Sequence, residues 1–129
     1  MSMYTIGKFS LMTPTSLEEA PALLASGKRG TRILAGGTGL ILQMKYRQVQ
    51  PSVVIDIKKI GETNCLDWRE AEGLRLGAAV PISRLMDFKA LNDKYSMLAK
   101  ACSLIGSTQV KNRAKVGGNI CNAAPSATC

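Results

Sequence analysis

Histidine is missing from this sequence of 129 residues, and aromatic side chains are scarce: one Trp, three Tyr and two Phe. Without histidine the chain has no Ser/His/Asp or Cys/His catalytic group, no His-ligated zinc and no histidine-based pH switch. The net charge of +8 favours anionic partners such as phosphates. However, the basic residues are spread along the chain and are not interleaved with aromatics, so we predict no nucleic-acid partner.

Long apolar runs are also absent. No stretch approaches the roughly 20 residues of a membrane span, and Met1–Leu11 lacks the apolar block of a signal peptide. We therefore predict a cytoplasmic protein without a membrane span. The composition, 46% hydrophobic and 20% charged, is that of a globular protein. The length fits one ordinary domain or two small lobes.

Closely spaced cysteines are missing too. The four cysteines contain no CxxC pair, so neither a four-cysteine metal site nor a disulfide framework is indicated. We predict no metal site. Reduced thiols that pack as small hydrophobic side chains are expected for Cys65, Cys102 and Cys121, whereas Cys129 is the last residue and stands apart.

The first 57 residues are predicted to form a small βα lobe. Two overlapping pairs, Thr15 with Glu18 and Ser16 with Glu19, have capping-box spacing, which predicts a helix that begins there and ends near Gly27. Thr31–Ala35 then reads as a strand, and Val53–Ile57 has the β-branched composition of a buried parallel strand. The expected apolar face of the first helix comprises Leu17, Ala20 and Leu24.

Residues 58–129 are predicted to form a second lobe with antiparallel structure. Leu66–Arg69 and Leu74–Ala78 read as a hairpin, and Pro81 is expected to open a helix. A further helix is predicted over Ser96–Ile105. The side chains expected in the core are Ile82, Leu85, Met86, Met97, Leu98, Ala101, Leu104 and Ile105.

A glycine cluster, Gly36-Gly37-Thr38-Gly39, follows the strand at Thr31–Ala35 and precedes a short helix or turn at Leu40–Lys45. Glycines between a strand and a helix allow close backbone approach and direct N–H groups at a phosphate. The cluster is neither a Walker A loop nor a Rossmann fingerprint. It predicts a phosphate or pyrophosphate ligand, against the alternative of a simple tight turn.

A second glycine loop is predicted within Arg113–Ala127, where Gly117-Gly118-Asn119 follows basic side chains. Two such loops, one from each lobe, could hold opposite sides of one extended dinucleotide. We predict that they face each other across one cleft, against the alternative of two unrelated loops.

Both motifs resemble a known family. Ala35-Gly36-Gly37-Thr38 with Leu40, Met44 and Lys45, and the later segment Arg113–Ala127, resemble the two flavin-binding motifs of the FAD (medium) subunit of molybdenum hydroxylases, the xanthine dehydrogenase and carbon monoxide dehydrogenase family. Either motif alone could mislead, but both in this order are specific. The resemblance extends from Phe9 to the end of the chain.

The resemblance implies an α+β, PCMH-type FAD-binding fold, in which a small βα lobe with a short parallel sheet precedes an incomplete antiparallel α+β lobe. FAD would lie between the lobes and pass electrons from iron–sulfur clusters to an acceptor. The implied partners are the molybdenum-cofactor and iron–sulfur subunits, and no residue need act as a catalytic acid or base. The implied cofactor contacts are Ile33, Leu34, Ala35, Gly36, Gly37, Thr38, Gly39, Leu40, Val116, Gly117, Gly118 and Asn119, with Ile105 near the flavin ring and Thr128 at the ribose or ribityl hydroxyls.

Three positions depart from the family pattern. Gly39 stands where Asp or Ser is usual, and Thr128 replaces an Asp that holds flavin hydroxyls. Lys115 stands where Thr or Ser is usual, so a hydroxyl is lost and a cation is offered instead.

The family subunit is about twice as long as this chain. We therefore expect an N-terminal piece of a flavin subunit that alone is inactive, binds FAD weakly or not at all, and self-associates. The alternatives are a non-catalytic interaction module without flavin and a nucleotide-binding regulator that uses the first glycine loop only.

Overall fold

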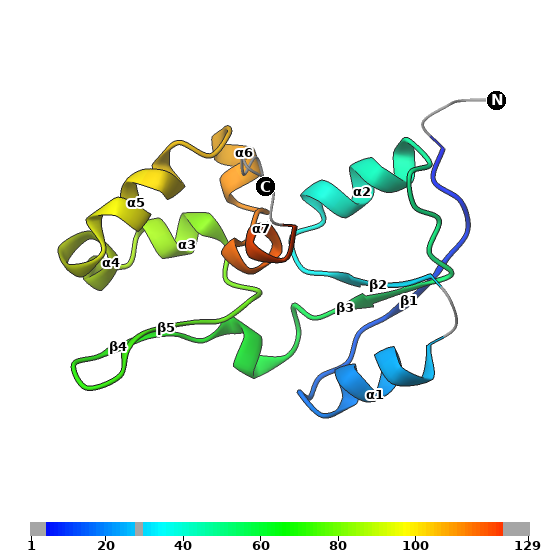
Figure 1. The fold of residues 1–129 in the computed structure, drawn as a ribbon, viewed down its shortest axis with the longest axis horizontal. Helices are drawn as coiled ribbons and strands as arrows, with labels where there is room; N and C mark the ends of the chain where they lie inside the picture. Colours follow the sequence, from blue (N-terminus) through cyan, green and yellow to red (C-terminus); the bar gives the residue numbers. More distant parts are fainter. Residues whose placement is uncertain (1–4, 28–29, 123–129) are drawn as a thin grey trace.

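The computed structural model describes residues 5–27 and 30–122. A parallel sheet forms one end of the molecule, and an antiparallel hairpin with several short helices forms the other (Figure 1). The parallel sheet has the strand order β1-β3-β2, with bounds Ser10–Met12, Val53–Asp56 and Thr31–Leu34. Leu34 pairs with Asp56, so β2 and β3 end at the same edge of the sheet.

Helices α1 (Glu19–Ser26) and α2 (Thr38–Lys45) lie on opposite sides of this sheet (Figure 1). The predicted Ser16–Glu19 capping box is confirmed in part: the Glu19 N–H donates to Ser16 Oγ at 3.2 Å, but the Glu19 carboxylate accepts from the Thr15 N–H at 3.1 Å, and the helix begins only at Glu19. The predicted apolar face of α1 is wrong, because Leu17 and Leu24 are exposed. A helix of two turns against three short strands can cover little more than one row of side chains, and even Ala20 and Leu23 are only half-buried.

The predicted hairpin is confirmed as β4 (Leu66–Arg69) and β5 (Gly73–Leu76), with Trp68 opposite Leu74. A 3-10 helix, η1 (Gly61–Asn64), connects it to the parallel sheet. The hydroxyl oxygen of Tyr95 accepts a hydrogen bond from the Leu74 N–H at 3.1 Å. This bond ties the hairpin to the helices that follow.

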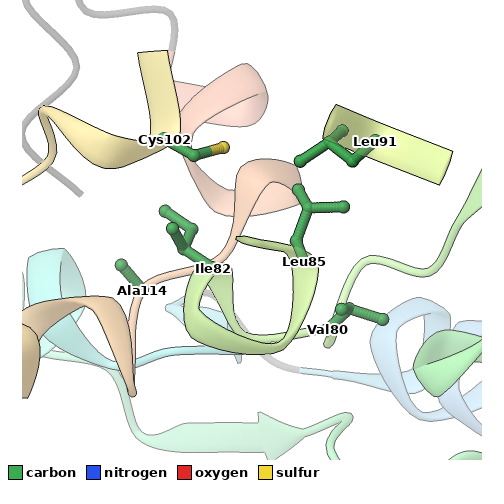
Figure 2. Close-up of a cluster of buried hydrophobic side chains, with 6 residues drawn as sticks. All are labelled: Val80, Ile82, Leu85, Leu91, Cys102 and Ala114. Carbon is green, nitrogen blue, oxygen red and sulfur yellow. The ribbon is translucent and has the colours of Figure 1, made fainter. Parts of the chain in front are cut away.

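The remaining helices are short: α3 (Ile82–Met86), α4 (Lys89–Lys94), α5 (Ser96–Ser103), α6 (Thr108–Lys111) and α7 (Val116–Asn122). They enclose a cluster of buried side chains, shown in Figure 2, that consists of Val80, Ile82, Leu85, Leu91, Cys102 and Ala114. Pro81 precedes α3 as predicted, and the core positions of Ile82 and Leu85 are confirmed.

The predicted core face of α5 is partly wrong. Met97 and Leu104 are 87% and 77% exposed, and Ala101 is exposed as well. The row that packs inward is Leu98, Cys102 and Ile105. Their spacing of four and three residues follows one side of the helix, and a two-turn helix cannot also bury the neighbouring side.

The predicted α+β class, with a short parallel sheet followed by antiparallel structure, is confirmed. Strand β1 and helix α4 were not predicted from the sequence, since three and six residues are too few for a periodic signal. A division between lobes at residue 57 stays a prediction.

Candidate functional site

The first glycine motif lies in the turn between β2 and α2, as predicted. Gly37 has φ +83° and immediately precedes the helix, and its carbonyl oxygen accepts from the Ile41 N–H at 3.0 Å. Gly39 and Leu40 fall in the first turn of α2 and are half-buried, whereas Ile33 on β2 is 49% exposed. The left-handed φ is the reason for glycine at position 37, because other residues adopt it only with strain.

The second motif is not the loop predicted from its glycines. Val116, Gly117, Gly118 and Asn119 form the first turn of helix α7, and the Asn119 N–H donates to the Lys115 carbonyl oxygen at 3.3 Å. A Cβ on Gly117 would lie 3.0 Å from Ala78 Cα, whereas a Cβ on Gly118 would meet nothing within 4 Å. Thus Gly117 permits close packing of α7, and Gly118 leaves its backbone open to a ligand.

The two motifs are in direct contact. A Cβ on Gly36 would overlap the carbonyl oxygen of Arg113 and lie 3.3 Å from Ala114 Cα. On the other side of this segment, the Ile82 N–H donates to the Ala114 carbonyl oxygen at 3.0 Å, and Pro81 forms a β-bridge with Lys115. The segment that leads into α7 is therefore held between the first glycine turn and the start of α3.

Charged side chains gather beside this contact at the edge where β3 ends. Lys58 Nζ lies 3.1 Å from Asp56 Oδ2. Lys115 is only 5% exposed. Burial lowers the pKa of Lys115, the positive charges of Lys58 and Arg113 lower this pKa further, and Asp56 raises it. Among the described residues no carboxylate lies within 4 Å of the Lys115 ammonium group.

One buried polar atom at the site lacks a partner among the described residues. Asn119 Oδ1 is inaccessible to solvent and accepts no hydrogen bond, which normally costs about 1–3 kcal/mol. The residues of the two motifs thus offer a buried cation, a hydrogen-bond acceptor and accessible glycine backbone. This set fits a ligand that carries both phosphates and hydroxyl groups.

One predicted contact, Ile105, is half-buried and packs on the buried cluster that includes Ala114. Another, Thr128, lies with residues 123–127 outside the described residues. Conversely, Arg113 and Lys115 were absent from the predicted cofactor contacts. Their basic character next to the glycine pair was a signal for a phosphate site, but it did not indicate that Lys115 would be buried.

A hollow of about 510 Å³ lies at the opposite edge of the parallel sheet, lined by residues 5–8, Met44, Arg47 and residues 49–52. Of the residues in the two glycine motifs only Met44, at the far end of the first motif, lines it, and none of their glycines does. Within the described part of the chain, no three Cys, Asp or Glu side chains are grouped as metal ligands. The helices described there are all too short or too polar to cross a membrane.

The chain is similar to known proteins over nearly its whole length. Residues 7–129 match the family described as FAD binding domain in molybdopterin dehydrogenase. The carbon monoxide dehydrogenase medium chain of Hydrogenophaga pseudoflava is 34% identical over 118 residues, which are 92% of this chain and 41% of that protein. The xanthine dehydrogenase FAD-binding subunit of Escherichia coli O157:H7 is 32% identical over 87% of this chain and 38% of its own length.

Solved structures show the same similarity. Carbon monoxide dehydrogenase from Oligotropha carboxidovorans matches with a TM-score of 0.88 and 29% identity over 94% of this chain and 42% of the other. Quinoline 2-oxidoreductase from Pseudomonas putida matches with a TM-score of 0.84 and 28% identity, again over about 40% of its chain. This chain therefore spans about two-fifths of the length of the relatives it matches.

Proposed function

Because this chain belongs to the family of FAD-binding domains of molybdopterin dehydrogenases, we propose that it holds FAD within the medium subunit of a molybdenum hydroxylase. The observation that carries this proposal is the contact between Gly36 and Arg113, which brings both glycine motifs to one site. The family match over residues 7–129 includes both motifs. When bound, FAD supplies hydride and one-electron chemistry that amino-acid side chains lack.

The two motifs would contact the diphosphate and ribityl part of the cofactor. Ala35 to Thr38 would present backbone N–H groups, and the open backbone of Gly118 would approach from α7. Asn119 Oδ1 would accept a hydrogen bond from a cofactor hydroxyl, which would satisfy this buried atom. The other proposed contacts are Ile33, Leu34, Gly39, Leu40, Val116 and Gly117, with Ile105 near the flavin ring and Thr128 at the ribose or ribityl hydroxyls.

The role of the whole protein is proposed by analogy with the relatives. The subunit would position FAD between iron–sulfur clusters on a partner chain, reduced by a molybdenum centre, and an electron acceptor. No side chain of this chain is required as an acid or base, so its contribution is binding and orientation. The rival reading, an interaction module without flavin, is not supported by the comparisons, since the matched proteins named above include FAD-binding ones.

Titration of the purified chain with FAD, followed by quenching of flavin fluorescence, tests cofactor binding. Saturable quenching by the chain, reduced in Gly118→Val, is expected, because the new side chain would stand where the backbone is now open. The Lys100→Met variant on α5 is the control and should bind like the unmodified chain. If millimolar chain does not affect FAD fluorescence, the proposal is wrong for this chain.

The partner proposal has a separate test. A tagged chain purified from the organism that carries the gene should co-elute with flavin, iron and molybdenum in size-exclusion chromatography. Flavin that elutes with the chain without either metal would contradict assembly with these partners and leave flavin binding intact.

Self-association is proposed from exposed apolar side chains on the last helices. Met97, Leu104 and Ile120 are each more than 70% exposed, and such side chains favour association when they are contiguous. Light scattering of the isolated chain should give a mass above 13.8 kDa. A monodisperse monomer at high concentration would contradict this proposal.

A further inference from the structure

Lys115 is buried where a cation is costly. It is 5% exposed, and its pKa is lowered by burial and by the neighbouring charges of Lys58 and Arg113. A buried ammonium group is normally paired with a carboxylate and hydrogen-bonded. Among the described residues, the acidic group that acts on Lys115 is Asp56, and Asp56 already forms an ion pair with Lys58 at 3.1 Å.

The local charges therefore do not balance. Among the described residues, the charged groups that act on Lys115 are the positive Lys58 and Arg113 and the negative Asp56, so positive charges outnumber negative ones. A buried titratable group with like-charged neighbours is a common feature of binding sites. The missing partner of the Lys115 ammonium group is an anion.

The position of Lys115 indicates which anion. Its backbone forms the bridge to Pro81 and accepts from the Asn119 N–H, so Lys115 lies one helical turn before the buried, unpartnered Asn119 Oδ1. Arg113, two residues earlier, packs against Gly36 of the first motif. An anion next to Lys115 would thus lie beside the segment that joins the two motifs, one helical turn from a group that can accept from a hydroxyl.

We propose that Lys115 is the counter-charge for the FAD diphosphate in this chain, a specificity-determining contact that selects phosphate-bearing flavin over riboflavin. This inference rests on the proposed function. Both phosphates of FAD are ionised at neutral pH, so the diphosphate would supply the negative charge that the buried ammonium group lacks. In the absence of ligand, the same ammonium group destabilises the fold.

Thermal unfolding followed by circular dichroism separates these effects. We compare the unmodified chain with Lys115→Met and Lys115→Thr, two neutral variants of different size, and with Lys100→Met, an exposed lysine with the same change in net charge. Each is measured alone and with FAD, ADP or riboflavin. Without ligand, at least one neutral variant at position 115 should melt at a higher temperature than the unmodified chain.

With FAD or ADP bound, the unmodified chain should melt at a higher temperature than the position-115 variants, the reverse of the order without ligand. Loss of a charge-assisted contact should weaken FAD and ADP about tenfold or more, and the shift in melting temperature should shrink accordingly. The small shift caused by riboflavin should be the same in all four proteins.

The outcomes distinguish the inference from the function on which it rests. Equal FAD shifts in the unmodified chain and both position-115 variants would overturn the role of Lys115 and leave flavin binding intact. The inference would be overturned, and Lys115 assigned a structural role, by either of two results. The first is that the position-115 variants lose as much of the riboflavin-induced shift in melting temperature as of the FAD-induced shift. The second is that both variants melt at a lower temperature than the unmodified chain without ligand. If neither FAD nor riboflavin changes the melting temperature of the unmodified chain, the proposed function is wrong, and the inference is wrong with it.

Discussion

Gly36 lies directly against the main-chain carbonyl of Arg113, more than seventy residues later in the sequence, with no room for a Cβ between them. The contact joins the turn after β2 to the segment that enters α7. Because both partners are backbone, neither can move aside as a flexible side chain could. The contact between the two glycine motifs therefore requires that residue 36 has no Cβ.

Gly36→Ala should consequently be among the most damaging single-methyl additions in the chain. We expect a loss of about 1–3 kcal/mol in the free energy of unfolding, the usual cost of overpacking, together with weaker FAD binding. Gly118→Ala is the matched control: its Cβ meets nothing, and alanine in a helix is favoured over glycine by about 0.5–1 kcal/mol. Urea denaturation checks both, and an unchanged midpoint for Gly36→Ala would contradict the contact.

Substitutions at Gly37 should lower stability through backbone conformation rather than through the size of the new side chain. Its φ of +83° is left-handed, and the atoms that a Cβ would meet are side-chain ends of Leu34 and Ile41. We expect Gly37→Ala to cost about 1–2 kcal/mol, and Gly37→Asn to cost less because asparagine tolerates this conformation. Equal unfolding free energies for the two variants would show that backbone strain is not the reason for glycine here.

Lys115 should make stability depend on pH in the alkaline range. Well below the lowered pKa the lysine is charged in both the folded and the unfolded chain, so its cost is constant. Between that pKa and about 10.4, the ordinary value for lysine, the unfolded chain binds more protons, and the free energy of unfolding rises with pH. Lys58, Arg113 and Asp56 are the charged groups that set this shift.

The comparison with Lys115→Met isolates this contribution from the other lysines. The variant should be more stable than the unmodified chain at neutral pH, and the difference should shrink as the pH rises through the window. A difference that does not change with pH would show that Lys115 titrates normally.

The cluster in Figure 2 should dominate the stability of the second half of the chain. Leu91 is fully buried in it, so Leu91→Ala should lower the free energy of unfolding by about 2–5 kcal/mol. Met97→Ala, on the neighbouring helix, removes an exposed side chain and should change it by no more than about 0.5 kcal/mol. Similar losses for the two variants would contradict the assigned core.

The cysteines should differ sharply in reactivity. Burial raises the pKa of the Cys102 thiol, and Cys102 is 1% exposed, whereas Cys121 is exposed. Because the thiolate is the reactive form, Cys121 should be alkylated rapidly in the folded chain and Cys102 only after unfolding. Peptide mapping by mass spectrometry after brief labelling checks this, and comparable labelling of both would show that the helical core opens readily.

Local patterns in the sequence determined most of the elements and the chemistry of the two motifs. The spacing of Ser16 and Glu19 predicted a helix start, the glycines after the strand at Thr31–Ala35 predicted a strand–turn–helix phosphate motif, and the alternation in residues 66–78 predicted the hairpin. These signals are strong because capping, turn geometry and strand alternation act between residues close in sequence.

Only the tertiary structure decided which apolar side chains are buried and how the motifs meet. Leu104 has the same local signal as Leu98, yet it is 77% exposed, because packing partners distant in sequence select one side of a short helix. Likewise, Gly117 and Gly118 look like a loop in sequence but lie in α7. The burial of Lys115 was also not predicted from the sequence, since its neighbours are distant along the chain: Pro81 bridges its backbone, and the charges of Asp56 and Lys58 act on it. Burial and electrostatic energy are set by contacts between distant segments, which local sequence patterns do not specify.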